Sequence, residues 1–116
     1  MDKKVKIILS QDAKKVYKYL NKESKNSKLE KSIFNAIKQK IELIKENFQY
    51  GDPVSKKLVP KKYIKKYGIT NLFRVELPNY WRMLYSVQEG ESRVEIIAFV
   101  LDIIDHDDYD KLFGYN

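Results

Sequence analysis

Residues 72–87, LFRVELPNYWRMLYSV, decide the fold, because apolar and polar residues alternate on both sides of Pro78 and Asn79. Alternation of this kind is typical of two strands that each bury one face. The apolar positions of both strands all carry odd numbers: Phe73, Val75, Leu77, Trp81, Met83, Tyr85 and Val87. The residue numbers of two directly opposed apolar residues must then add up to an even number. A two-residue turn at 78–79 would pair residues whose numbers add up to an odd number, so it is excluded. We therefore expect a three-residue connection, residues 78–80, with Leu77 opposite Trp81 and Glu76 opposite Arg82.

The same register places Arg74 and Arg82 together on the face of the hairpin that does not enter the core. Six lysines lie in the eleven residues that lead up to it: Lys56, Lys57, Lys61, Lys62, Lys65 and Lys66. Arginines on a rigid sheet beside a lysine cluster suit the binding of phosphate, which favours RNA or another polyanion as the partner. Two simpler interpretations stay open. Arg82 and Glu76 can form an ordinary cross-strand ion pair, and Arg74 can serve only to keep a sheet edge soluble.

The chain before the hairpin predicts one strand and two helices. Residues 5–9 are β-branched and aliphatic, which favours a strand. Ser10 is a candidate N-cap for a helix whose apolar stripe has helical spacing: Ala13, Val16, Tyr17 and Leu20. Ser27 and Glu30 form a capping box at the start of a longer helix, with a seam of Ile33, Ile37, Ile41, Ile44 and Phe48. Gly51 and Pro53 are expected to end it, so the two helices should form an antiparallel hairpin.

Residues 52–70 are predicted to be irregular and basic. Three segments of period two follow, at residues 72–77, 80–87 and 93–101, with a turn around Gly90. The last of them contains VEIIAFVL, which is nearly all apolar and should be covered on both faces. Residues 107–113 have room for one or two helical turns. The expected fold is α+β: an antiparallel sheet of strand 1 and a three-strand C-terminal meander, with the helical hairpin on one face and a single domain over residues 1–116.

Composition limits the classes of protein. The chain has no cysteine and a formal net charge of +7, so disulfides are excluded and anionic partners are favoured. No apolar run is long enough to span a bilayer, and the N-terminus lacks a signal peptide's cleavage pattern, so we expect a cytoplasmic protein. The acidic C-terminal cluster fits neither the EF-hand spacing nor a two-histidine zinc helix, so no metal is expected: Asp102, Asp105, His106, Asp107, Asp108 and Asp110.

The order of these elements resembles the RelE/ParE superfamily of bacterial and archaeal toxin–antitoxin toxins. Residues 72–87 are similar to that family's hairpin, Leu-x-Arg-x-Arg followed by Tyr-Arg-x-x-Tyr. The likeness continues in VEIIAFVL, which leads into His106 and Tyr109 where family members often carry basic, histidine and tyrosine residues. The architecture covers essentially the whole chain, whereas the motifs cover about forty residues and are moderately specific.

RelE-type members cut mRNA on the ribosome by attack of a 2′-hydroxyl on the adjacent phosphate, without a metal. The resemblance implies that Arg82 contacts the scissile phosphate, that Arg74 matches the catalytic arginine of the preceding strand, and that His106 and Tyr109 are acid/base and base-stacking candidates. Simpler interpretations stay open for both: His106 as a surface or helix-cap residue, and Tyr109 as packing of the terminal turn on the sheet. One or more of four lysines correspond loosely to the family's basic residues before that strand, and all four are RNA-binding candidates: Lys56, Lys57, Lys61 and Lys62. The implied partners are mRNA, the ribosome and a cognate antitoxin. No cofactor, membrane or small-molecule ligand is expected.

The sequence departs from the family pattern in two places. The hairpin connection is one residue longer than the common version, and Asp107 and Asp108 follow His106 where many active relatives have arginine or lysine. ParE-type members share the fold, lack the nuclease residues and act on DNA gyrase. The leading hypothesis is therefore a ribosome-dependent mRNA endoribonuclease. The alternative is a ParE-like or inactive member of the fold that acts by protein binding, for example on a topoisomerase.

Overall fold

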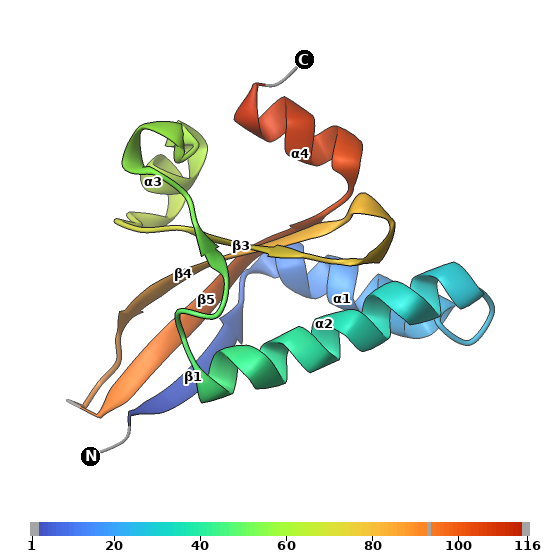
Figure 1. The fold of residues 1–116 in the computed structure, drawn as a ribbon, viewed down its shortest axis with the longest axis horizontal. Helices are drawn as coiled ribbons and strands as arrows, with labels where there is room; N and C mark the ends of the chain where they lie inside the picture. The colour runs from blue at the N-terminus through green and yellow to red at the C-terminus, as the bar shows by residue number, and fades with distance from the viewer. Residues whose placement is uncertain (1–2, 93, 115–116) are drawn as a thin grey trace.

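The computed structural model describes residues 3–92 and 94–114, which form an α+β fold around a five-stranded mixed sheet (Figure 1). The strand order is β1-β5-β4-β3-β2. The strands are β1 (Lys4–Leu9), β2 (Asp52–Pro53), β3 (Phe73–Glu76), β4 (Arg82–Glu89) and β5 (Glu95–Ile104). Helices α1 (Gln11–Glu23) and α2 (Lys28–Glu46) lie on one face of the sheet, and α3 (Lys61–Tyr67) and α4 (His106–Phe113) lie on the other.

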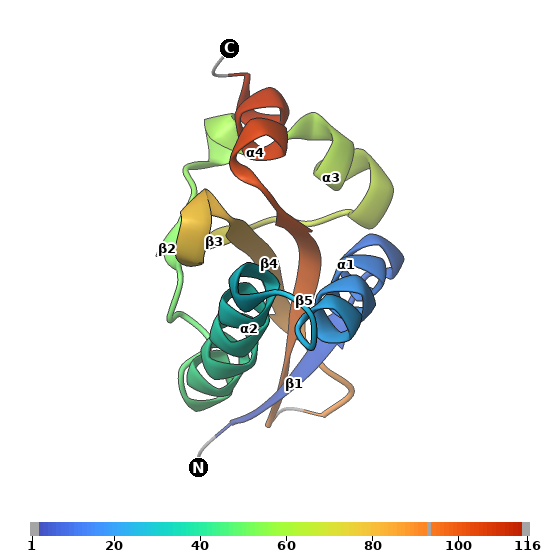
Figure 2. The same cartoon turned by 90° about the vertical axis from the view of Figure 1, so that its right-hand side faces the viewer.

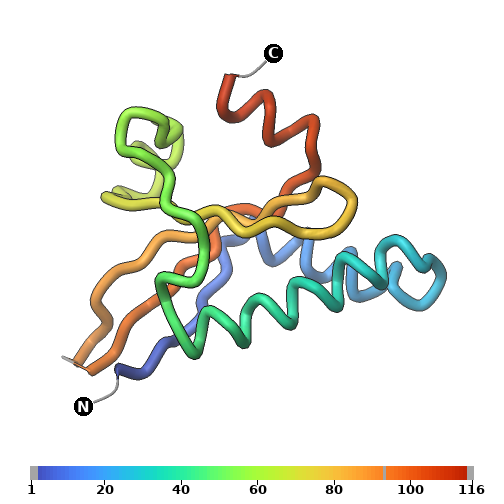
Figure 3. Tube along the Cα trace, in the orientation of Figure 1, coloured from blue at the N-terminus to red at the C-terminus, as the bar shows by residue number. Residues whose placement is uncertain are grey.

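Two predictions about the sheet are wrong. The predicted sheet was antiparallel with four strands, but β1 pairs in parallel with β5, from Lys4 opposite Glu95 to Leu9 opposite Val100. Figure 3 shows these two segments side by side along their length. The fifth strand is the two-residue β2, whose Asp52 pairs with Arg74. Alternation of residues locates a strand but carries no information on its direction, and two residues are too few to show a period.

The helical hairpin has the predicted caps. The Ser10 hydroxyl accepts a hydrogen bond from the Ala13 N–H at 3.0 Å and donates one to the Leu101 carbonyl at 2.6 Å, so it joins α1 to β5. At the start of α2, the Ser27 hydroxyl accepts from the Glu30 N–H and donates to the Glu30 carboxylate. Only half of the predicted capping box is present, because the Ser27 N–H donates to the Glu23 carbonyl and not to the Glu30 carboxylate. Figure 2 shows α1 and α2 side by side across the sheet.

Between the helical hairpin and the sheet lies the first core, which contains the odd-numbered side chains of the β-hairpin. Met83 and Tyr85 are fully buried there against Ile37 and Ile44 of α2. The Tyr85 hydroxyl donates to the Phe48 carbonyl at 2.8 Å and accepts from the Gly51 N–H at 2.9 Å, which fixes the chain between α2 and β2. A Cβ at Gly51 would lie 3.0 Å from the Arg74 carbonyl oxygen, so this close approach requires glycine.

The β-hairpin has the predicted register. Glu76 pairs with Arg82, and the Leu77 N–H donates to the Trp81 carbonyl at 2.9 Å across a three-residue connection, Pro78–Tyr80. Asn79 and Tyr80 both have left-handed backbones, with φ of 62° and 63°. Asparagine tolerates this region, but a bulky residue such as tyrosine is strained there.

The opposite face of the sheet has a second core, under α3 and α4. Its buried residues are Tyr63, Leu72, Leu84, Leu101 and Tyr109. The prediction that residues 52–70 are irregular is therefore wrong, because this segment contains a 3₁₀ turn, Lys56–Leu58, and helix α3. Burial of β5 on both faces is confirmed.

The predicted short C-terminal helix is α4. Asp105 is its N-cap and accepts a hydrogen bond from the Asp108 N–H at 2.9 Å. None of the helices in the described residues is both long and apolar enough to cross a lipid bilayer.

Candidate functional site

Two arginines and one tyrosine meet where the β3–β4 hairpin lies beneath α4. Arg74 Nη1 donates to Tyr109 Oη at 3.0 Å, and the Arg82 guanidinium carbon lies 4.7 Å from the centre of the Tyr109 ring. Tyr109 is only 4% exposed, because its ring packs against Phe113 in the second core. The hydrogen bond with Tyr109 raises the pKa of Arg74 further above neutrality. Tyr109 therefore holds two charged guanidinium groups on one face of the sheet.

Glu76 binds both arginines. Its Oε2 lies 2.9 Å from Arg82 Nε, and its Oε1 lies 3.3 Å from Arg74 Nε. Neither Nε reaches solvent, and neither makes a hydrogen bond of good geometry, so the carboxylate is their nearest compensation. Asp52 adds a second carboxylate 3.8 Å from Arg74 Nη2. The predicted pairing of Glu76 with Arg82 is thus present, and each arginine already has an anionic neighbour within the protein.

The two arginines differ in accessibility. The Arg82 side chain is 13% exposed and the Arg74 side chain is 36% exposed. Arg82 Nη1 also donates a hydrogen bond to the carbonyl oxygen of Tyr80, the residue whose backbone is left-handed. A ligand approaching from solvent thus meets mainly Arg74 and the outer edge of Arg82.

His106 lies beside the strained hairpin connection. Its ring centre is 5.8 Å from that of Tyr80, and Tyr80 is 71% exposed. His106 Nε2 lies 3.2 Å from Asp110 Oδ2, one turn further along α4. Arg74, Tyr109, Arg82, Tyr80 and His106 therefore form one continuous series of contacts, which we call the arginine site.

The candidate lysines lie outside this series. Lys56 and Lys57 are exposed in the 3₁₀ turn. That turn borders a hollow of about 140 Å³ whose lining includes Ser55, Leu58 and the arginine-site residues Arg74 and Tyr109. Lys61 and Lys62 are exposed on α3 and line a different and larger space.

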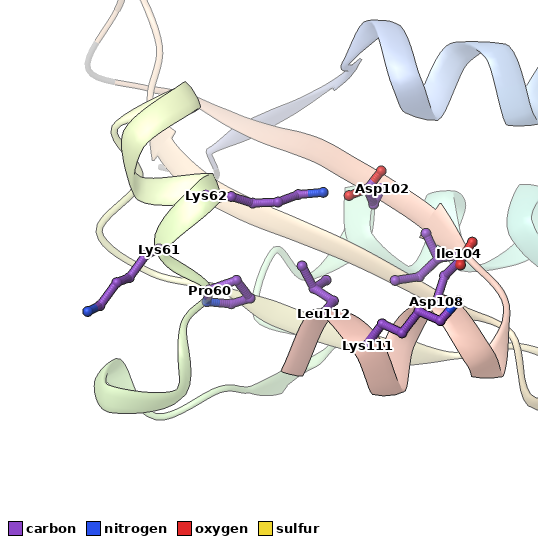
Figure 4. Close-up of a pocket in the computed structure, with 8 residues that line it drawn as sticks. All are labelled: Pro60, Lys61, Lys62, Asp102, Ile104, Asp108, Lys111 and Leu112. Carbon is purple, nitrogen blue, oxygen red and sulfur yellow. The ribbon is translucent and has the colours of Figure 1, made fainter. Parts of the chain in front are cut away.

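That larger space is a cleft of about 570 Å³ between α3 and α4, with β5 as its floor (Figure 4). Its lining residues are Pro60, Lys61, Lys62, Asp102, Ile104, Asp108, Lys111 and Leu112. Beneath it, the Tyr63 hydroxyl donates to Asp102 Oδ2 at 2.5 Å. Burial raises the pKa of Asp102, and burial together with this hydrogen bond raises the pKa of Tyr63. We call this the α3–α4 cleft.

The acidic C-terminal residues do not gather around a common point. Across residues 3–92 and 94–114, no three histidine, aspartate or glutamate side chains lie close enough together to hold a metal ion. Asp105 caps α4, Asp110 lies beside His106, and Asp102 contacts Tyr63. These carboxylates thus have separate structural partners.

Comparisons with protein-family models, curated proteins and solved structures found no match for this chain. The likeness to RelE/ParE toxins therefore rests on the hairpin motif and the order of elements alone.

Two features were not predicted from the sequence: the carboxylate of Asp52 near Arg74, and the α3–α4 cleft. The second carboxylate near Arg74 comes from Asp52, whose two-residue strand has no recognisable pattern. The cleft depends on α3, whose sequence KKYIKKY reads as a charge cluster. Pro60 at the helix start and Gly68 just after its end, with φ of 64°, are start and stop signals that identify this helix.

Proposed function

We propose that this chain is a RelE-like toxin that cuts mRNA on the ribosome, as a metal-independent endoribonuclease. The observation that carries the proposal is the continuity of the arginine site, because residues 74, 80, 82, 106 and 109 come from four elements and contact one another in series. Two guanidinium groups, an exposed aromatic ring and an imidazole are the side chains that cleavage of a flexible RNA strand needs.

In the proposed reaction, the 2′-oxygen attacks the adjacent phosphorus, and the bond from phosphorus to the 5′-oxygen breaks. Arg82 and Arg74 stabilise the additional negative charge on the phosphate oxygens. The 2′-hydroxyl loses a proton and the leaving 5′-oxygen gains one, and His106 exchanges one of these protons while water exchanges the other. Tyr80 offers an exposed ring on which a neighbouring base can stack.

The buried position of Tyr109 gives it a different part in this proposal from base stacking. It orients the two guanidinium groups, by its hydroxyl for Arg74 and by its ring for Arg82. The entering phosphate takes the place of the Glu76 carboxylate on Arg82, exchanging one anion for another in the same position. The exposed lysines around the site and the net charge of +7 attract the RNA backbone.

The proposed partners are the translated mRNA, the ribosome and an antitoxin that covers the basic face, and the proposed compartment is the cytoplasm. A small acidic open reading frame next to the one that encodes this chain is the expected source of the antitoxin.

A second candidate function is favoured by the two carboxylates. Glu76 and Asp52 already neutralise the arginines, as expected of a site that has no anionic substrate. In that case the protein is a non-nuclease member of the fold, which acts by binding a protein target such as a topoisomerase.

Primer extension on an mRNA translated in a cell-free extract separates the two candidates. We expect cuts at defined codon positions with the wild-type protein, and a loss of roughly 100-fold or more with Arg82→Ala or with His106→Ala. Glu76→Gln is expected to retain cleavage, because it removes the competing carboxylate. Lys22→Ala, an exposed lysine on α1, is the matched control that should cut normally.

Intact mRNA together with growth arrest on expression would support the second candidate. The absence of both mRNA cleavage and growth arrest would overturn both candidate functions. Circular dichroism and urea unfolding of each variant distinguish a lost reaction from a lost fold.

A further inference from the structure

The α3–α4 cleft holds a cation and an anion that form no ion pair with each other. Both contact Tyr63 instead: Lys62 Nζ lies 5.7 Å from the centre of its ring, and Asp102 accepts a hydrogen bond from its hydroxyl. Lys62 and Asp102 project into the cleft toward each other, from α3 and from β5 (Figure 4). The positive charge of Lys62 lowers the pKa of Asp102, against the larger raising effect of burial, so the two groups are electrostatically coupled. Nevertheless, among the ion pairs of the described residues within 4.0 Å, none joins Lys62 to Asp102. A space therefore remains between a cation and an anion.

Three apolar side chains line the same cleft between its charged residues. Ile104 forms part of the floor, and Pro60 and Leu112 lie on opposite sides, from the start of α3 and from α4. The volume of about 570 Å³ lies within the range of small-molecule sites, roughly 300–1,000 Å³. Such walls accept a flat, weakly polar group, with its polar edge directed at Lys62 and Asp102.

The hydrogen-bonding groups of Lys62 and Asp102, a donor beside an acceptor, are complementary to one edge of guanine. A carboxylate only accepts hydrogen bonds and an ammonium group only donates them. Asp102 receives one hydrogen bond from Tyr63 on Oδ2, which leaves further lone pairs on both oxygens. Guanine presents a carbonyl acceptor beside two adjacent N–H donors, and this pattern suits a lysine next to an aspartate. Adenine and cytosine have the reverse order, with an amino donor next to a ring-nitrogen acceptor.

We propose that the α3–α4 cleft binds a guanine nucleotide, with Lys62 donating to the base carbonyl and Asp102 accepting from the ring N–H and the 2-amino group. Lys111, at the α4 rim of the cleft, faces the phosphate. The ligand chemistry is the same for a free nucleotide and for a guanosine within an RNA strand. The residues that line the cleft are distinct from those of the arginine site, and the proposal does not depend on nuclease activity.

Matched nucleotides test the proposal on the wild-type protein. The probes are guanosine 5′-monophosphate, inosine 5′-monophosphate, which lacks only the 2-amino group, and adenosine 5′-monophosphate, with binding followed by isothermal titration calorimetry. We expect the guanosine nucleotide to bind about 10-fold more tightly than the inosine nucleotide, the usual effect of one hydrogen bond to a charged group. The adenosine nucleotide should bind more weakly than either. A guanine-containing RNA trinucleotide, compared with the free nucleotide, shows which source is preferred.

Two variants assign the contacts. Asp102→Asn should abolish the difference between the guanosine and inosine nucleotides, whereas Lys62→Ala should weaken both by the same factor and preserve their ratio. Asp107→Asn and Lys22→Ala, which change exposed residues outside the cleft, are the controls.

Equal affinity of the wild-type protein for all three nucleotides would overturn the proposal, as would the absence of binding at millimolar concentration. Binding of an acidic peptide together with no binding of the guanosine nucleotide would also overturn the proposal, and would assign the cleft to a protein partner. Because the ligand comparison uses the unaltered protein, the proposal remains testable even if Asp102→Asn fails to fold.

Discussion

At the residue scale, Tyr63 gives the protein a specific weakness toward alkali. Its side chain is buried, and burial and the hydrogen bond to Asp102 raise its pKa well above the ordinary value. The folded protein therefore keeps the phenol proton at a pH where the unfolded chain, with a tyrosine pKa of about 10, has released it. Since the unfolded state then binds fewer protons, the free energy of unfolding falls as the pH rises above about 10.

We expect the wild-type protein to lose roughly 1.4 kcal/mol of stability for each pH unit above about 10 for each such tyrosine. Tyr85 contributes in the same direction, because burial raises its pKa too. Tyr63→Phe should be less stable near neutral pH but should lose less on alkalinisation. Urea unfolding at about pH 8 and about pH 10.5 measures both effects. An unchanged alkaline slope in Tyr63→Phe would contradict the assignment, and Tyr19→Phe, at an exposed position, is the control.

The residues that sequence reasoning placed correctly are those whose side chains must alternate. The odd-numbered apolar positions fixed Arg74, Glu76 and Arg82 on one face of the hairpin, because one residue of slippage would have exposed Met83 and Tyr85. The contact of Tyr80 with His106 has no such basis. It depends on a left-handed backbone at Tyr80 and on where α4 begins, and no periodic pattern specifies either.

At the element scale, Ser10 links helix α1 to the central part of the sheet. One hydroxyl accepts from the Ala13 N–H and donates to the Leu101 carbonyl, and both groups are buried. Replacing it removes a helix cap and leaves a strand carbonyl without a partner. These losses cost about 0.5–2 kcal/mol for the cap and about 1–3 kcal/mol for the buried carbonyl.

Ser10→Ala should therefore lower the free energy of unfolding by roughly 1.5–5 kcal/mol, the sum of the two effects. Ser27→Ala removes a cap at a half-buried position on α2 and should cost only about 1 kcal/mol. Urea unfolding followed by circular dichroism compares the two variants. Equal losses would show that the bond from Ser10 to Leu101 contributes nothing.

The elements that the sequence predicted are those whose pattern is long. Helix α2 has Ile33, Ile37, Ile41 and Ile44 at helical spacing after a Ser-x-x-Glu start, although the fifth predicted position, Phe48, lies beyond its end at Glu46. Strand β5 contains an apolar run from Ile96 to Leu101. Helix α3 was missed, since four of its seven residues are lysines and only one side chain, Tyr63, is fully buried. Because α3 was not predicted, the α3–α4 cleft was not predicted either, since α4 and β5 form only part of its lining.

At the scale of the whole molecule, the net charge of +7 opposes folding. On α1, Lys14, Lys18 and Lys22 follow one another at intervals of four residues, so like charges face each other along the helix. Added salt screens this repulsion. We expect the free energy of unfolding to rise by on the order of 0.5 kcal/mol between about 0.02 M and about 0.3 M sodium chloride.

The triple variant Lys14→Gln, Lys18→Gln and Lys22→Gln lowers the net charge from +7 to +4, because three positive charges are removed. It should be more stable at low salt and less sensitive to salt than the wild-type protein. Urea unfolding at the two salt concentrations provides the comparison. A fall in wild-type stability with salt would show that attractive surface ion pairs outweigh the repulsion.

The parallel pairing of β1 with β5 also determines the stage of synthesis at which the sheet can form. Ser10 and Leu101 are hydrogen-bonded across 91 positions of the chain, and within residues 3–92 and 94–114 β1 pairs with no strand other than β5. The nascent chain therefore exposes β1 and the apolar side of the helical hairpin until β5 has been translated, because such distant partners pair late. Helix α4, which supplies His106 and Tyr109, follows β5 directly. The arginine site thus cannot assemble until α4 has been translated and packed on the sheet, so a protein proposed to attack translating ribosomes is inactive at every earlier stage of its own synthesis.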